Sequence, residues 1–117
     1  MNRPFAYECV QFVHPALAKS KRRKAGVYLI DNVYVGASTS VRQRVLGHVN
    51  NALSNNHDNK PLGIYLTKKI QSGEPITIHL LSEQITDEQA LIDKARQLGL
   101  PLLNSTSVYA KAYRPKP

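Results

Sequence analysis

The sequence has no tryptophan, a single cysteine (Cys9), and 8 acidic residues against 16 lysines and arginines. One cysteine excludes an intramolecular disulfide and a cysteine-rich zinc site, and it suits a reducing cytosol. No apolar run approaches the ~20 residues of a membrane span, and the first ten residues lack the charged-then-apolar layout of a signal peptide. We therefore expect a cytoplasmic protein with no membrane partner, associated with the nucleoid or present in the cytosol of a phage-infected cell.

The 117 residues are enough for one domain with a modest hydrophobic core, but not for two independent cores. We expect an N-terminal extension over residues 1–24, a folded domain over 25–108 and a basic, proline-rich tail over 109–117. The sequence alone leaves open whether the extension packs on the domain or folds only on a nucleic acid.

The excess of positive charge, +8 overall, is concentrated in one short run. Its members are Lys19, Lys21, Arg22, Arg23 and Lys24. One interpretation is a solvated loop. The other is an arm that contacts phosphates, because clustered cations gain free energy by releasing counterions from a polyanion. The charge favours nucleic acid as partner over a membrane, since the run has no apolar face to insert.

The chain alternates between β-prone and helix-prone segments. Phe5–Val13 is β-prone, so we expect an extended stretch there. Val27–Ile30 and Val33–Val35 flank Asp31-Asn32, which predicts a hairpin with a two-residue turn ending at Gly36. Glu74–Leu81 alternates as a half-buried strand.

Three helices are expected between and after these strands. Valines spaced by four predict a helix over Val41–Leu53, and Pro61 precedes a second helix over about Leu62–Gln71. A third helix opens at Thr86, with Gln89 completing a capping box, and stops at Gly99. The fold class that follows is α+β, with a small, about three-stranded antiparallel sheet flanked by three helices.

Two short motifs, Gly26-Val27-Tyr28 and Tyr34-Val35-Gly36, resemble the paired signature of the GIY-YIG endonuclease superfamily, with valine in place of isoleucine in both halves. Further motifs follow in the order typical of this family, and the resemblance covers about residues 25–108. They are Arg44 and His48, the segment His57–Leu62, Glu88 with Ile92, and Leu102-Leu103-Asn104. One departure is that only five residues separate Tyr28 from Tyr34, which a tight hairpin explains.

The resemblance implies an endonuclease that hydrolyses phosphodiester bonds with one Mg²⁺ or Mn²⁺ per active site. Glu88 would be the metal ligand, and Arg44 would stabilise the charge of the transition state. A bland alternative for Glu88 is to complement a helix dipole. Asn104 would be a positioning residue that bonds the loop after the third helix to the motif strands.

The identity of the general base stays open. In the family the tyrosine of the first motif, here Tyr28, is favoured, but a phenol with a pKa near ~10 needs help to ionise at neutral pH. His48 competes because its ordinary pKa suits neutral pH. Tyr34 would orient the water or the phosphate. Arg44 and His48 are four residues apart, so we expect them to share a helix face that the valines leave free.

The expected partner is DNA, with RNA as an alternative, and the contacts fall to the basic run together with Gly36 and His57. Gly36 would let the backbone pass close to the first helix or to the phosphate. A single site nicks one strand, so a duplex break needs a dimer or two successive events. A homodimer or a partner protein would supply specificity. Two other functions remain open: a non-catalytic nucleic-acid-binding module, and a DNA or RNA nuclease acting as a toxin or in phage conflict.

Overall fold

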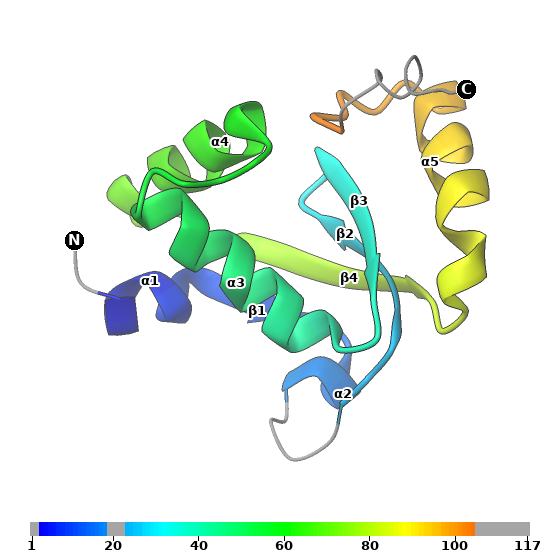
Figure 1. Ribbon diagram of the computed structural model, residues 1–117, viewed down its shortest axis with the longest axis horizontal. Coiled ribbons are helices and arrows are strands. Elements are labelled where there is room, and N and C mark those ends of the chain that lie inside the picture. The colour runs from blue at the N-terminus through cyan, green and yellow to red at the C-terminus, as the bar shows by residue number, and fades with distance from the viewer. Residues whose placement is uncertain (1–2, 19–22, 105–117) are drawn as a thin grey trace.

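A mixed four-stranded sheet is the centre of the fold (Figure 1). The structure, a computed structural model, describes residues 3–18 and 23–104. In chain order its elements are α1 (Arg3–Cys9), β1 (Val10–Phe12), α2 (Pro15–Ala18), β2 (Gly26–Ile30), β3 (Tyr34–Ser38), α3 (Val41–Leu53), α4 (Lys60–Gln71), β4 (Ile76–Ser82), the 3₁₀ helix η1 (Ile85–Asp87) and α5 (Glu88–Gln97). The α+β class is therefore confirmed.

The sheet differs from the expected three antiparallel strands. Its order is β1-β4-β2-β3, with β2 antiparallel to both β3 and β4, and β1 added parallel to β4. The extended stretch expected over Phe5–Val13 is half wrong, because its first part forms α1. Ala6 of α1 lies in the core, and the Tyr7 hydroxyl donates to Asn50 Oδ1 at 2.6 Å, so tertiary packing overrides β propensity.

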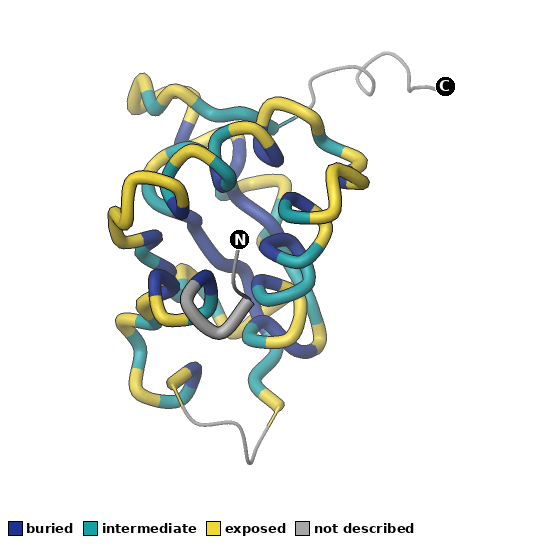
Figure 2. The backbone as a smooth tube through the Cα atoms, turned by 90° about the vertical axis from the view of Figure 1, so that its left-hand side faces the viewer, coloured by how far each residue is buried: buried dark blue, intermediate teal, exposed yellow. Residues whose placement is uncertain are grey.

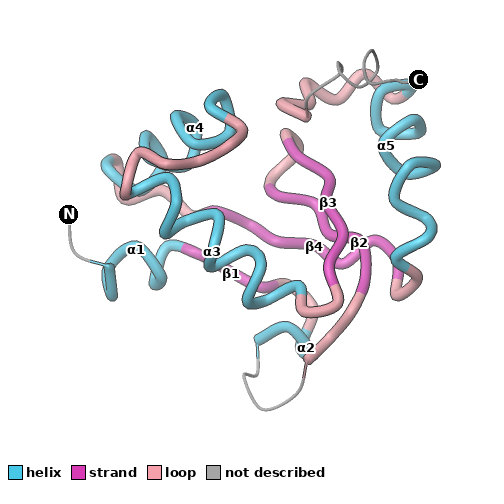
Figure 3. Tube along the Cα trace, viewed as in Figure 1, coloured by secondary structure: helices cyan, strands magenta, loops and turns pink. Residues whose placement is uncertain are grey.

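Helices cover both faces of the sheet (Figure 3). One face carries the larger core, in which Tyr28, Ile30, Ile76 and Ile78 meet α3 and α4. The other face carries a smaller core, in which Val27, Leu29 and Val35 meet α5. Buried residues follow the central strands and the inner helix faces in Figure 2. No helix in the described part of the chain is long and apolar enough to cross a membrane.

The N-terminal segment is part of this packing. Ala6, Val10 and Leu17 lie in the larger core. The part of the expected extension that holds these three residues therefore packs on the domain. The basic tail expected over 109–117 lies outside the described residues.

The helix predictions hold to different degrees. The α3 helix has the predicted bounds, and Gly99, with φ +81°, follows α5 as expected. The α4 helix begins earlier, at Lys60, because Asn59 caps it by accepting from the Leu62 amide at 3.1 Å. The capping box at Thr86 is wrong: Thr86 lies in η1, and Gln89 donates to Asp93 instead.

The β2–β3 hairpin turns through three residues, Asp31, Asn32 and Val33, and β3 continues beyond Gly36 to Ser38. Asp31 has φ +49°, a conformation that Asp tolerates better than most residues. Its side chain accepts hydrogen bonds from the Thr77 amide, at 2.8 Å, and from the Tyr65 hydroxyl. The turn is therefore tied to β4 and to α4.

Replacing Asp31 should destabilise the protein according to what the new side chain retains. Asp31→Ala removes both acceptors and strains the turn, so we expect a loss of about 2–4 kcal/mol in the free energy of unfolding. Asp31→Asn keeps an acceptor oxygen and tolerates the positive φ, so the loss should stay near ~1 kcal/mol. Urea denaturation of both variants measures the difference, and equal losses would contradict the bracing role.

Candidate active site

The first motif tyrosine lies across the glycine of the second motif. Tyr28 pairs with Gly36 in the antiparallel register, and its ring is 1% exposed. A Cβ on Gly36 would lie 2.5 Å from the Tyr28 hydroxyl oxygen and 2.6 Å from Cζ. A close approach was expected at Gly36, and among protein groups its nearest neighbour is the Tyr28 ring and not the first helix.

The Tyr28 hydroxyl opens a chain of buried hydrogen bonds. It lies 2.8 Å from His48 Nε2, and His48 Nδ1 lies 2.8 Å from His57 Nε2. The two imidazole rings are nearly parallel, with centroids 4.9 Å apart. Tyr34 meets the edge of His48 at 5.4 Å. Strands β2 and β3, helix α3 and the loop before α4 thus bring four aromatic rings together.

Two residue positions differ from the expectation. His48 is 5% exposed and belongs to the buried stripe of α3, whereas Arg44 is exposed, so the two side chains share a helix face but only Arg44 reaches far into solvent. His57 is 7% exposed and lies against His48. The structure thus gives His57 an inward contact through its Nε2 atom.

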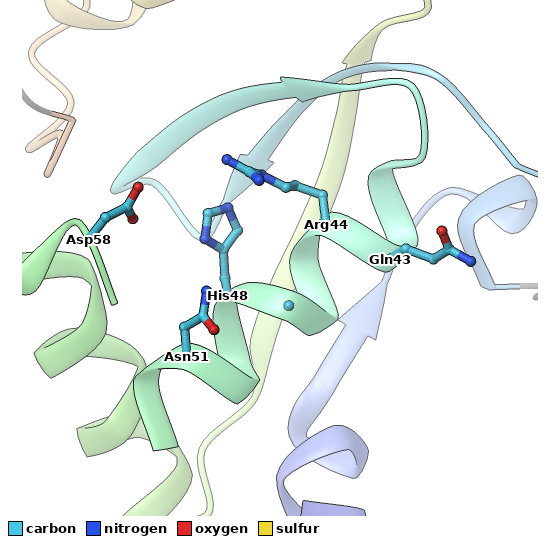
Figure 4. A pocket seen from close by; sticks show the side chains of 6 residues that line it. Gln43, Arg44, His48, Asn51 and Asp58 are labelled. Atoms are coloured by element: carbon cyan, nitrogen blue, oxygen red, sulfur yellow. The ribbon is translucent and has the colours of Figure 1, made fainter. Parts of the chain in front are cut away.

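A polar pocket of about 180 Å³ opens beside His48. Arg44 and Asp58 lie on opposite sides of it, with His48 between them (Figure 4). The rest of its lining is Gln43, Gly47 and Asn51. We did not expect these three residues at the site, although their spacing of four places them on one stripe of α3 beside Arg44 and His48.

The charge of Arg44 acts on every titratable group of this cluster. Burial raises the pKa of Tyr28, Tyr34 and Glu88, and the Arg44 guanidinium opposes each of these shifts. Glu88 in turn raises the pKa of both tyrosines. Glu88, at the start of α5, therefore lies close enough to the tyrosines of β2 and β3 to affect their pKa.

His48 is held neutral by its surroundings. Burial, the neighbouring His57 and the positive charge of Arg44 lower the pKa of His48 to about 4. Burial likewise lowers the pKa of His57, with Asp58 opposing the shift. Both rings are therefore uncharged at neutral pH.

Glu88 is the carboxylate that suits a metal. It is half-buried, and its three rivals bind other side chains: Glu83 binds Lys24 at 2.8 Å, Asp87 accepts from Ser82, and Asp93 accepts from Gln89. Within residues 3–18 and 23–104, no cluster of three or more His, Cys, Asp or Glu side chains forms a larger ligand set. One carboxylate fits a hydrated Mg²⁺, which keeps most of its waters, and would not hold a dehydrated ion.

Two asparagines fasten the loops around the site. Asn104 Oδ1 accepts from the Val35 amide at 2.9 Å while its Nδ2 donates to the Val35 carbonyl at 2.7 Å. The contact expected between Asn104 and the motif strands is thus present. Asn59 donates through Nδ2 to the Leu103 carbonyl at 2.8 Å.

The structure describes two members of the basic run. Lys24 is paired with Glu83, and Arg23 is exposed. Lys19, Lys21 and Arg22 lie outside the described residues.

The buried histidines predict a pH dependence of stability. A folded-state pKa of about 4 lies below the unfolded value of 6.5, so His48 stabilises the fold fully above pH 6.5. This contribution, on the order of 2–3 kcal/mol, should be lost as the pH falls from 6.5 toward 4. Urea denaturation across this range should show a shallower pH dependence for His48→Gln than for wild type. His79→Gln, at an exposed histidine, should keep the wild-type slope, and an unchanged slope in His48→Gln would refute the prediction.

Comparison with known proteins assigns neither a family nor a function to this arrangement of residues. The chain matches no family model, no curated protein and no solved structure. Any function therefore has to be argued from the residues and their arrangement.

Proposed function

We propose that this protein is a metal-dependent DNA endonuclease of the GIY-YIG type that hydrolyses one phosphodiester bond per site. The observation that carries the proposal is the convergence on one exposed arginine of a buried tyrosine, a half-buried tyrosine, a neutral histidine and a half-buried carboxylate. Arg44 affects the pKa of all four groups, and they come from β2, β3, α3 and α5. Phosphodiester hydrolysis needs this combination of a base, a fixed cation and a metal-binding carboxylate.

Tyr28 is the general base for the attacking water in this proposal. Burial alone would keep its phenol protonated, so its ionisation depends on nearby positive charge. Arg44 supplies part of that charge. A divalent ion on Glu88 would supply the rest, and it would also polarise the phosphate.

His48 is the weaker candidate for the base. A group with a pKa of about 4 holds a proton poorly, so it is a poor acceptor for the proton of water at neutral pH. Its ring is also occupied on both nitrogens, by Tyr28 and by His57. We therefore assign His48 to the support of Tyr28.

The pocket beside Arg44 is the proposed position of the scissile phosphate and its backbone. The guanidinium fork of Arg44 suits two phosphate oxygens, and the amides of Gln43 and Asn51 can bond to sugar or phosphate. Gly47 lies mid-helix, where nothing within 4 Å would contact an added Cβ. Packing therefore does not require this glycine, which weakens the helix, but close approach of a nucleic-acid backbone would explain it.

A non-catalytic nucleic-acid-binding module is the second candidate. The observation that favours it is the absence, among the described residues, of any acidic or histidine cluster beyond Glu88 that could hold a metal. Such a module would bind DNA without cutting it at any Mg²⁺ or Mn²⁺ concentration.

Nicking of supercoiled plasmid tests the proposed function. Wild type should convert the plasmid to open circles only when Mg²⁺ or Mn²⁺ is added. Glu88→Ala and Arg44→Ala should each lower the rate at least ~100-fold while remaining folded, because each removes charge stabilisation from the transition state. Glu83→Ala is the matched control, since Glu83 is an exposed carboxylate paired with Lys24, and it should nick at the wild-type rate. DNA binding without metal-dependent nicking by wild type would favour the binding module instead.

Substitutions at Gly47 should separate stability from substrate access. Gly47→Ala should raise the free energy of unfolding by about 0.5–1 kcal/mol, because alanine favours the helix and meets no neighbour. Gly47→Leu should fill the pocket and weaken DNA binding by about tenfold or more without destabilising the fold. Gln71→Leu, at the exposed end of α4 and outside the pocket lining, should bind DNA as wild type does. Unchanged DNA binding in Gly47→Leu would exclude the pocket as the substrate position.

A further inference from the structure

The hydrogen-bond chain behind Tyr28 ends on a backbone amide. Asn59 N lies 3.0 Å from His57 Nδ1 in hydrogen-bonding geometry. The chain thus runs from Asn59 through His57 and His48 to the Tyr28 hydroxyl, over one bond of 3.0 Å and two of 2.8 Å. Both of its imidazole rings, His48 and His57, are buried.

The amide decides which nitrogen of each ring carries the proton. A backbone N–H only donates, so Nδ1 of His57 has to accept, and the ring proton of neutral His57 lies on Nε2. That Nε2–H faces His48 Nδ1, which therefore accepts as well. The proton of His48 then lies on Nε2 and is donated to the Tyr28 oxygen.

Among the residues that the structure describes, Asp58 is the group that could reverse this order. Its Oδ1 lies 3.3 Å from His57 Nδ1 and would accept a proton placed there. The Asn59 N–H is shared between this oxygen, at 2.9 Å, and His57 Nδ1, but the Asp58 side chain is 89% exposed, so water competes for its oxygens. A proton on Nδ1 would also face the Asn59 N–H across 3.0 Å, and the backbone cannot rotate away as an exposed carboxylate can.

The elements around His57 hold both the ring and the amide. Asn59 Oδ1 caps α4 through the Leu62 amide, and Asn59 Nδ2 binds the Leu103 carbonyl. On the other side, α4 comes so close that a Cβ on Gly63 would lie 2.9 Å from His57 Cβ. The amide donor and the imidazole therefore have little freedom to exchange partners.

We propose that His57 is a positioning residue: directed by the Asn59 amide, it fixes His48 in the Nε2–H form, so that His48 donates a hydrogen bond to Tyr28. The oxygen of Tyr28 is then an acceptor, and its own proton points away from His48. A donor aimed at this oxygen stabilises the phenolate over the phenol. Only the catalytic consequence rests on the proposed endonuclease function; the proton positions do not.

Nitrogen-15 NMR of the histidine rings tests the proton positions directly. In ¹⁵N-labelled wild type at neutral pH, two-bond correlations should assign the Nε2–H form to both His48 and His57. A coupling across the N–H···N bond should connect His48 Nδ1 to the proton on His57 Nε2. Asp58→Asn should leave this pattern unchanged, because the amide and not the carboxylate sets it. A proton on Nδ1 of either ring in wild type, or a reversal in Asp58→Asn, would overturn the proposal.

The catalytic consequence is tested with two variants that preserve the volume of the ring to different degrees. His57→Phe keeps a stacked ring but offers no donor, and it should lower kcat about tenfold with the KM for DNA changed less than about twofold. His57→Gln can present an N–H near the position of Nε2, and it should recover most of this loss. The rising limb of the pH–rate profile should also move upward by about one unit in His57→Phe, because the Tyr28 phenolate loses a donor while Tyr34, Arg44 and Glu88 stay in place.

The outcomes separate the two proposals. Equal losses in His57→Phe and His57→Gln that follow their thermal stabilities, with no shift of the pH profile, would make His57 purely structural and overturn its positioning role. Absence of cleavage by wild type would overturn the endonuclease proposal, and the ring nitrogens would then decide the assignment of His57 alone.

Discussion

The burial of one phenol hydroxyl makes demands that the surrounding structure has to meet. Tyr28 lies across Gly36 in the β2–β3 hairpin, which carries its polar oxygen into the larger core. A buried polar atom without a partner costs about 1–3 kcal/mol, so the oxygen needs a hydrogen bond. His48 provides it, but at the expense of burying a second polar ring, whose other nitrogen needs His57. This series of hydrogen bonds ends at Asn59. Its backbone amide and side chain connect the series to the start of α4 and to the loop before Asn104.

The parts of the fold that were predictable are those that a local sequence pattern determines. The bounds of α3 follow from valines at Val41, Val45 and Val49, because a local spacing matches the helical repeat. The parallel pairing of β1 with β4 joins segments more than sixty residues apart, and no local pattern encodes it. The α1 helix was missed for a related reason. Its residues favour strands, and contacts with α3, such as that from Tyr7 to Asn50, decide the outcome.

The site was predictable as a set of residues but not as an arrangement. Spacing placed Arg44 and His48 on adjacent turns of one helix, yet only the packed structure shows their different burial, with Arg44 exposed and His48 buried at the base of the same pocket lining. His57 could be selected from the sequence, but its inward orientation depends on Gly63 in α4 and on the amide of Asn59. Asn104 was predicted correctly as a fastener because a terminal amide can bond both backbone groups of a strand edge.

Electrostatic interactions decide which groups of the candidate site are charged. The histidine pair stays neutral chiefly because both rings are buried, and the positive charge of Arg44 adds to the lowering of their pKa. The uncharged rings therefore support Tyr28 without neutralising the arginine or competing with it. Glu88, which is half-buried, and Asp58, which is exposed, are the carboxylates that act on the cluster, and Glu88 in the proposed function is occupied by a divalent ion. A metal bound there would remove the acid that opposes tyrosine ionisation, leaving Arg44 and the ion as two positive charges near the Tyr28 oxygen. Ionisation of the base and binding of an anionic phosphate would then depend on the same two charges, so substrate and phenolate would both be favoured only once the metal is in place.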